Sequence, residues 1–206
     1  MNKVKKLLKP LYHKYLAINC VLQRTIFASI HRLKIPMNRN IKIDSNVRFY
    51  NGTRVVYYGG IMEVGRNTEI CSYSKFIIWG GFLKIGSGCL LGEYGIYNTF
   101  ADLIIGDNVM TADRVSFVTN IHEYEDISTP IRKQPSISDA IVIGDGTWIG
   151  MNVTILAGSH IGKNCVVAAN CVVKGNYPDY CVIGGVPSHI IKQYNVKTKK
   201  WEKYEI

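Results

Sequence analysis

From Ile143 onward, an aliphatic residue recurs at every sixth position of the chain. The matches are Ile143, Ile149, Ile155, Ile161, Val167 and Val173. The residue after most of them is small, as in Gly144, Gly150, Gly162 and Ala168. A hexapeptide period is a short strand followed by a turn, and three such units make one coil of a triangular β-solenoid. Because one coil cannot bury its apolar face alone, the coils must stack.

The same unit occurs earlier in the chain at wider intervals. Ile43, Val64, Ile85 and Ile105 are each followed by Gly or Asp, and they lie 21, 21 and 20 residues apart. This spacing fits three hexapeptides with extra residues at a corner of the coil. The sequence therefore predicts an all-β solenoid, a parallel β-helix of about six triangular coils between residues 41 and 178.

The repeat is interrupted from about Asn120 to Ala140. This segment, NIHEYEDISTPIRKQPSISDA, is polar and contains Pro130 and Pro135. Solenoids place such insertions on one face, often the functional one, and loops of about twenty residues in compact domains are usually functional or disordered. We expect residues 120–140 to form a protruding loop with a functional role.

The two ends of the chain lack the hexapeptide. In residues 1–40, apolar residues follow helical spacing with Lys and Arg between them, which predicts a basic amphipathic helical appendage. The hexapeptide-repeat region then occupies residues 41–183. A Gly-Gly-Val-Pro turn opens the last segment, residues 184–206, which we expect to be a turn and a Lys-rich tail that packs only partly.

The net charge is +10, and most of it lies outside the repeat region. Residues 1–40 contribute +9, residues 41–191 contribute −2 and residues 192–206 contribute +3. A nucleic-acid binder would carry its positive charge on the fold itself, so nucleic acid is not expected as a partner. The basic appendage suits an anionic membrane surface. The alternative is a helix that packs on its own assembly and keeps its cations solvated.

Membrane-spanning and secretory patterns are both missing from the sequence. No run of about eighteen apolar residues occurs, and no apolar signal region with a small-residue cleavage site follows the basic start. We expect a cytoplasmic protein that contacts the inner face of the membrane peripherally through residues 1–40.

The stretch from Thr147 to Tyr194, TWIGMNVTILAGSHIGKNCVVAANCVVKGNYPDYCVIGGVPSHIIKQY, resembles the C-terminal half of hexapeptide-repeat acyltransferases. It is most similar to acetyl-CoA-dependent O-acetyltransferases of galactosides, maltose and surface polysaccharides, in its Trp-Ile-Gly, Val-Val-Lys and Gly-Val-Pro landmarks. The resemblance covers about residues 41–192. It implies a left-handed winding, a homotrimer, acetyl-CoA bound between neighbouring prisms, and acetyl transfer to a carbohydrate hydroxyl.

Acyl transfer from a thioester to a hydroxyl needs a base for the hydroxyl proton and donors for the oxyanion. Of the five His, only His122 opens the insertion, where the resembling acetyltransferases carry their catalytic His. An unperturbed imidazole suits this proton transfer at neutral pH. We predict that His122 is the general base, the alternative being a surface His without a role. Glu123, Glu125 and Asp126 are candidates to orient its ring.

Two further residues match acceptor-site positions of the family. Glu93 lies where the family commonly has an Asn that binds the acceptor. Its carboxylate could accept sugar hydroxyls or raise the basicity of His122, the alternative being a polar residue at a coil corner. Trp148 follows the insertion, where the family places an aromatic residue against the cleft. It is a candidate stacking surface, the alternative being a residue of the local core.

The resemblance also implies a binding site for acetyl-CoA. The family's contact positions correspond here to Met151, Ala169, Lys174, Gly175, His189 and Lys192. Two of them depart from the usual pattern, because a Thr-Lys pair reads Lys174-Gly175 and a Pro-Ala-Lys/Arg motif reads Pro187-Ser188-His189. The first departure shifts a cation by one residue, and the second replaces a permanent cation with a titratable one.

No metal site is expected. The six Cys form no CxxC motif, and Cys89, Cys165 and Cys171 occupy the small fifth position of a hexapeptide, which indicates core packing. The three-His set of solenoid carbonic anhydrases is also missing. Two other functions remain open from the sequence: an acetyltransferase for an amino sugar or antibiotic, and a catalytically silent scaffold.

Overall fold

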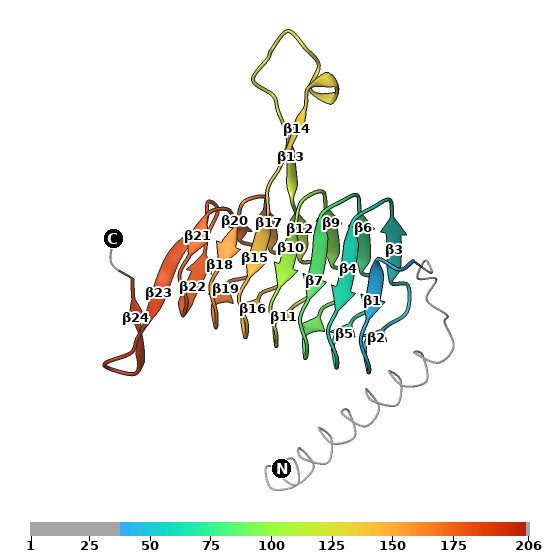
Figure 1. The fold of residues 1–206 in the computed structure, drawn as a ribbon. Coiled ribbons are helices and arrows are strands. Elements are labelled where there is room, and N and C mark those ends of the chain that lie inside the picture. The colour runs from blue at the N-terminus through green and yellow to red at the C-terminus, as the bar shows by residue number, and fades with distance from the viewer. Residues whose placement is uncertain (1–37, 205–206) are drawn as a thin grey trace, which may run out of the picture.

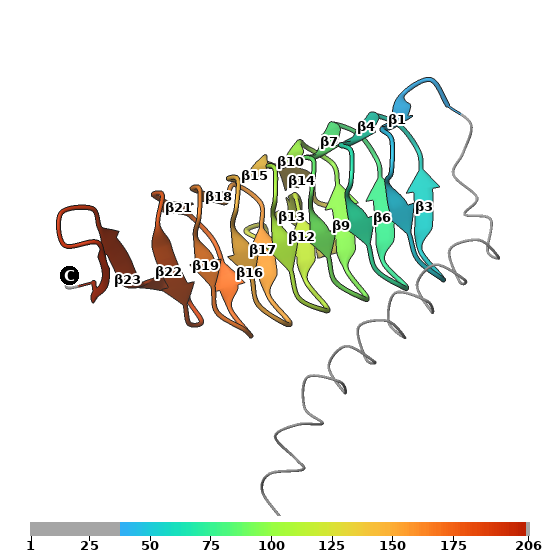
Figure 2. The same cartoon turned by 90° about the horizontal axis from the view of Figure 1, so that it is seen from below.

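The computed structural model describes residues 38–204, which form a parallel β-solenoid with three faces (Figures 1 and 2). The first sheet contains β1 (Ile41–Ile43), β4 (Ile61–Val64), β7 (Phe82–Ile85), β10 (Leu103–Ile105), β15 (Ile141–Ile143), β18 (His160–Ile161) and β21 (Asn176–Tyr177). The second sheet contains β2 (Arg48–Phe49), β5 (Glu69–Ile70), β8 (Leu90–Leu91), β11 (Met110–Thr111), β16 (Trp148–Ile149), β19 (Val166–Val167), β22 (Cys181–Gly184), β23 (His189–Asn195) and β24 (Lys200–Lys203). The third sheet contains β3 (Arg54–Tyr57), β6 (Lys75–Ile78), β9 (Ile96–Thr99), β12 (Ser116–Val118), β17 (Thr154–Leu156) and β20 (Val172–Val173). Each of these six third-sheet strands belongs to one coil, so the prediction of about six coils is confirmed.

Residues at the same position of the predicted hexapeptide pair with one another across the sheets. In the first sheet, Ile85 pairs with Ile105, Ile105 with Ile143, and Ile143 with Ile161. All four side chains are buried. Residues that recur at the hexapeptide period therefore stack on one another through successive coils and form a continuous core. Burying each such side chain contributes about 1.5–3 kcal/mol.

Aromatic rings fill the core along the third sheet. Phe76, Tyr97 and Phe117 are fully buried and stack in successive coils, with ring centroids 4.4 and 5.2 Å apart. Such offset stacks add attraction beyond the area they bury. The Tyr97 hydroxyl makes no hydrogen bond within residues 38–204.

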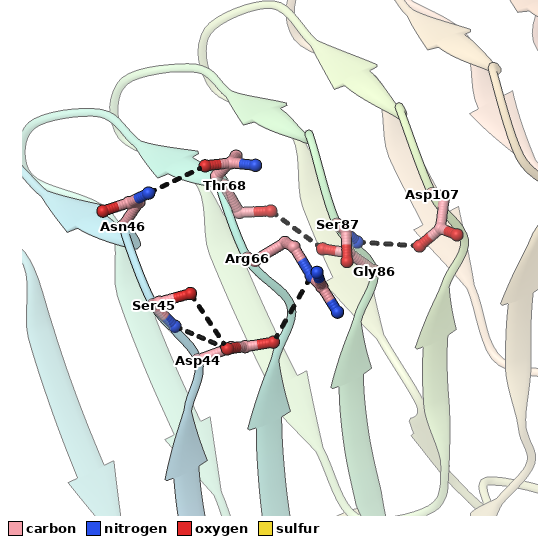
Figure 3. Close-up of polar contacts among 9 residues, drawn as sticks. Asp44, Ser45, Asn46, Arg66, Thr68, Gly86, Ser87 and Asp107 are labelled. Carbon is pink, nitrogen blue, oxygen red and sulfur yellow. Dashed lines mark hydrogen bonds and ion pairs between the residues drawn. The ribbon is translucent and has the colours of Figure 1, made fainter.

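Between strands the chain turns at three corners. We call them the first corner (from first sheet to second), the second corner (from second to third) and the third corner (from third back to first). Figure 3 shows the first corner, where side chains bond the backbone of the neighbouring coil. The Ser87 amide donates to Asp107 Oδ1 at 2.7 Å, and the Thr68 hydroxyl donates to the Gly86 carbonyl at 2.8 Å. These bonds satisfy backbone groups that the strands leave unpaired.

The insertion at 120–140, expected as a protruding loop, is an antiparallel arm. Strand β13 (Asn120–His122) pairs with β14 (Ser136–Ser138), and a 3-10 helix, η1 (Ile131–Lys133), lies between them. The arm projects away from the prism at the third corner (Figure 1). Its two strands satisfy each other's backbone, because no neighbouring coil is within reach there.

The C-terminal segment is also more regular than expected. Strand β23 pairs antiparallel with β22, and β24 pairs antiparallel with β23, so the tail extends the second sheet beyond the last coil. Every residue of β24 is exposed, and its Lys200 and Lys203 discourage pairing with another chain at this edge.

Part of the expected architecture falls outside the described residues. The helical appendage at residues 1–40 lies almost entirely before residue 38, where the description begins. Within residues 38–204, no helix has the length and apolar character needed to cross a bilayer.

Candidate active site

His122 ends strand β13 in the projecting arm, and its side chain is exposed. The arm is anchored at Thr119, whose hydroxyl accepts a hydrogen bond from the Phe100 amide at 2.8 Å. The Thr119 carbonyl accepts a second bond from the Asp139 amide at 2.9 Å, so both ends of the arm meet at one residue. Across the arm, His122 pairs with Ser136. The fold therefore holds this imidazole away from the prism on a braced hairpin.

Within residues 38–204, none of the candidates Glu123, Glu125 and Asp126 forms a hydrogen bond or ion pair with the His122 ring. Asp126 instead accepts bonds from the Ser128 amide and hydroxyl at 2.9 and 2.6 Å, and these hydrogen bonds lower the pKa of Asp126. No hydrogen bond or ion pair reaches the imidazole from any side chain in residues 38–204. This part of the chain therefore contains no side chain that fixes the orientation of the His122 ring.

Glu93 lies at the second corner, in the turn after β8, and its side chain is exposed. Its amide donates to Asp113 Oδ1 at 2.9 Å, and its carbonyl accepts from the Arg114 amide at 2.8 Å. These contacts fix the backbone and leave the carboxylate in solvent. Since His122 leaves from the third corner, one chain does not bring the two residues together.

Trp148 lies on the outer face of the second sheet and is 47% exposed, so its interpretation as a core residue is wrong. It stands in register between Met110 of β11 and Val166 of β19. Leu90 and Val182 continue this outward row on β8 and β22. The row is an apolar surface on which Trp148 is the largest side chain.

The residues predicted to bind acetyl-CoA fall into two groups. Met151 and Ala169 lie exposed in successive coils at the second corner, where the Asn170 amide donates to the Met151 carbonyl at 2.9 Å. The second group contains Lys174, Gly175, His189 and Lys192, and its Gly175 follows β20 at the third corner. The two groups flank the last strands of the third sheet, β17 and β20.

The second group is held to the C-terminal turn by Ser188. The Lys174 amide donates to Ser188 Oγ at 3.3 Å, and the Tyr177 hydroxyl lies 2.6 Å from the same oxygen. His189 follows Ser188 and is exposed, and Lys192 is exposed on β23. The structure thus brings Lys174 close to the turn that carries His189. Tyr177, which makes this connection, was missed because nothing in its hexapeptide position marks it.

The described residues offer no metal-binding cluster of three or more His, Cys, Asp or Glu side chains. The thiols of Cys89, Cys165, Cys171 and Cys181 are buried. Burial raises the pKa of Cys181 to about 11, which disfavours its reactive thiolate.

A protein-family model, bacterial transferase hexapeptide (six repeats), matches residues 140–175. The chain is 35% identical over 141 residues to a protein of Mycobacterium tuberculosis named as a probable acetyltransferase, Rv3034c, and that alignment spans 68% of this chain and 46% of the relative. It is 37% identical over 170 residues to WbbJ of Escherichia coli K12, named for O-acetyl transfer in lipopolysaccharide biosynthesis, across 75% of this chain and 86% of WbbJ.

Among solved structures, a mutant of the N-acyltransferase AntD of Bacillus cereus, in complex with dTDP and coenzyme A, superposes with a TM-score of 0.64. The two chains are 19% identical, and the superposition covers 76% of this chain and 86% of AntD. This likeness concerns the fold.

Proposed function

The chain belongs to the hexapeptide-repeat acyltransferases, and from this premise we propose that it transfers an acetyl group from acetyl-CoA to a hydroxyl group of a carbohydrate. The observation that carries the proposal is the similarity to WbbJ along most of that protein's length. The exposed His122 on its braced arm supports it, because a general base must reach a hydroxyl on another molecule.

In the proposed reaction, acetyl-CoA supplies an activated thioester carbonyl. His122 accepts the proton of the sugar hydroxyl as the hydroxyl oxygen forms its bond to that carbonyl carbon. The carbon–sulfur bond then breaks, and the imidazolium returns the proton to the departing thiolate. Both substrates are bound at once, so no acetyl group is held on the protein.

The residues present fit the chemistry of a nucleotide thioester. Lys174 and Lys192 offer cations for phosphates, and His189 adds an exposed imidazole on the same strand as Lys192. Backbone groups at the exposed Met151 and Ala169 are candidates for contacts with the pantetheine arm. Glu93 and Trp148 are proposed to contact the acceptor.

We further propose a left-handed winding and a homotrimer in which the site lies between subunits. Support comes from the positions of Glu93 and His122 at different corners, since a second copy supplies the residue that one chain leaves distant. The outward row around Trp148 gives such a copy an apolar surface to cover.

The proposal extends to the cell. The basic residues within positions 1–40 are proposed to hold a cytoplasmic enzyme on the inner face of an anionic membrane. Each Lys or Arg near such a surface contributes about 1 kcal/mol of attraction. Co-sedimentation with anionic liposomes tests this, and equal sedimentation without residues 1–40 would contradict it.

The function is tested with the purified protein, acetyl-CoA labelled in its acetyl group, and a mixture of bacterial surface oligosaccharides. We expect label in the carbohydrate as an alkali-labile ester, which distinguishes an O-acetyl from an N-acetyl product. Isothermal titration with acetyl-CoA is run in parallel. Alkali-stable label would indicate an amino-sugar acceptor, and failure to bind acetyl-CoA would indicate a silent scaffold.

A further inference from the structure

One column of residues at the second corner has a left-handed backbone in all six coils. The column contains Gly52, Tyr73, Tyr94, Arg114, Asn152 and Asn170, with φ between 57° and 73°. The chain places them equivalently, since the Tyr94 amide donates to the carbonyl of Ser72 and the Arg114 amide to that of Glu93, each in the coil before. They therefore lie in line along one edge of the prism.

Three members of this column, Tyr73, Tyr94 and Arg114, are of residue types that rarely adopt a left-handed backbone conformation. Gly adopts positive φ freely and Asn tolerates it, whereas bulky side chains there are outliers. The equivalent column at the first corner contains Asn46, Asn67, Gly88, Asn108, Gly146, Asn164 and Tyr180. Its last member, Tyr180, also has positive φ, but its ring packs against Tyr194 of the tail. Large residues in this conformation tend to occur at functional sites.

The fold itself would be satisfied by Asn at these places, as it is in the last two coils of the same column. What Tyr73, Tyr94 and Arg114 add is an exposed surface. The two Tyr are 50% and 49% exposed, and their rings are nearly parallel, with centroids 5.1 Å apart. The ring of Tyr73 lies over Gly52, where any side chain would collide with it.

The ring of Tyr94 therefore has Tyr73 on one face and the coil of Arg114 on the other. Arg114 is exposed and forms no ion pair within residues 38–204. Glu93, next to Tyr94, is exposed as well. Along this edge the molecule presents aromatic rings, a guanidinium and a carboxylate side by side.

This combination fits a carbohydrate. The exposed edges of the two stacked Tyr rings offer hydroxyls that donate to and accept from sugar hydroxyls, Arg donates forked hydrogen bonds to neighbouring oxygens, and Glu accepts from hydroxyls. Strands of successive coils lie about 4.8 Å apart, so three coils span about 10 Å, which is more than a single sugar ring. The mixed charges favour this ligand over an anionic lipid surface, which would select cations alone.

We propose that Tyr73, Tyr94 and Arg114 form a ridge that binds an extended oligosaccharide of the acceptor, beyond the sugar that is acetylated. The inference rests on the proposed function and adds a length requirement to it. The same corner continues through Glu93 to Met151 and Ala169, so the ridge leads from the glycan toward the residues proposed to hold acetyl-CoA.

The test uses the full chain and two variants that copy the Asn of the later coils, the double variant Tyr73→Asn/Tyr94→Asn and the single variant Arg114→Asn. Tyr180→Asn is the matched control, because it also replaces an exposed Tyr at positive φ. Each protein is applied to a printed array of bacterial surface oligosaccharides, and its melting temperature is recorded.

We expect the unsubstituted protein and Tyr180→Asn to bind the same array glycan. The ridge variants should bind it about tenfold or more weakly while melting within a few degrees of the unsubstituted protein. In transfer assays their KM should rise for that oligosaccharide and stay unchanged for the methyl glycoside of its terminal sugar.

Two results would overturn the proposal: no binding to any array glycan, or unchanged binding by the ridge variants whatever their melting temperature. The proposal would also be overturned if the ridge variants lost binding to liposomes or to another protein and kept their binding to glycans. The proposed function fails separately, if the ridge binds glycan but no acetyl group is transferred. If the ridge variants acetylate oligosaccharides as fast as the unsubstituted protein does, the ridge proposal fails and the proposed function stands.

Discussion

Glu93 and His122 leave the solenoid from two different corners of the prism. Glu93 lies in the turn between β8 and β9, and His122 lies on the antiparallel arm between β12 and β15. Each side chain is exposed, and no residue of the described part of the chain, 38–204, ties one to the other. If both act on one acceptor, they must come from different copies of the chain.

This arrangement predicts complementation between two inactive variants. His122→Ala and Glu93→Ala are each expected to lose acetyl transfer as homotrimers. When equal amounts are unfolded together and reassembled, about a quarter of the sites should contain both native residues, since each subunit supplies one residue to each neighbouring site. Activity should recover to that level in a transfer assay. No recovery, with mixed trimers confirmed by native mass spectrometry, would place both residues in one subunit's site.

The buried Tyr97 hydroxyl predicts a stabilising substitution. It makes no hydrogen bond of standard geometry within residues 38–204, and burial raises the pKa of Tyr97, while the neighbouring Thr111 side chain lowers it. Tyr97→Phe should raise the free energy of unfolding by about 1 kcal/mol, since it removes an unsatisfied polar group and keeps the ring stack. Urea denaturation measures the change. Phe76→Tyr is the opposite control and should destabilise, and a loss of stability in Tyr97→Phe would show that its hydroxyl is satisfied.

The raised pKa of Cys181, about 11, predicts chemical inertness. Burial is the main cause, followed by the nearby Cys165 and Asp179. At pH 8 the thiolate fraction in the folded protein should be about one in a thousand. Peptide mapping after treatment with a disulfide reagent should find Cys89, Cys165, Cys171 and Cys181 unmodified in the folded protein and modified after denaturation. Rapid labelling of Cys181 in the folded state would be inconsistent with its burial.

Asp145 predicts a loss of stability in acid. The backbone amide of Asp107 donates to it at 2.9 Å and holds the pKa of this carboxyl below the ordinary value of 3.8, with Lys163 adding a smaller effect from 3.3 Å. Folding therefore favours the carboxylate. Its contribution is complete above the unfolded-state pKa and is lost as the pH falls through the lower folded-state pKa.

Asp145→Ala should accordingly reduce the free energy of unfolding at pH 7 by about 1 kcal/mol or less, because the site is largely solvated. The difference from the unsubstituted protein should shrink as urea denaturation is repeated at successively lower pH below 3.8. Asp145→Asn keeps an oxygen acceptor and should lose less at pH 7. A pH-independent difference would mean that charge has no part in the effect.

The core could be predicted from the sequence because its physics is periodic. Ile105, Ile143 and Ile161 recur at the right intervals, and stacking them is the only way to bury them. The arm could be located but not described, since its polar sequence has no period to indicate antiparallel pairing. The separation of Glu93 from His122 depends on which corner of the prism each turn occupies. Because the coils differ in length, the corners could not be assigned from the sequence. The ridge was missed because a left-handed backbone at Tyr73 and Tyr94 is visible only once the coils are aligned.

General-base catalysis by His122 is tested by mass spectrometry of surface glycans from cells that lack the gene and from the same cells carrying it back in altered form. The unsubstituted protein and the control His160→Ala should restore O-acetyl groups. His122→Ala should leave them missing, although it is expressed, folded and able to bind acetyl-CoA, because loss of a general base typically costs about 10²–10⁴ in rate. Full O-acetylation with His122→Ala would show that His122 is not the general base.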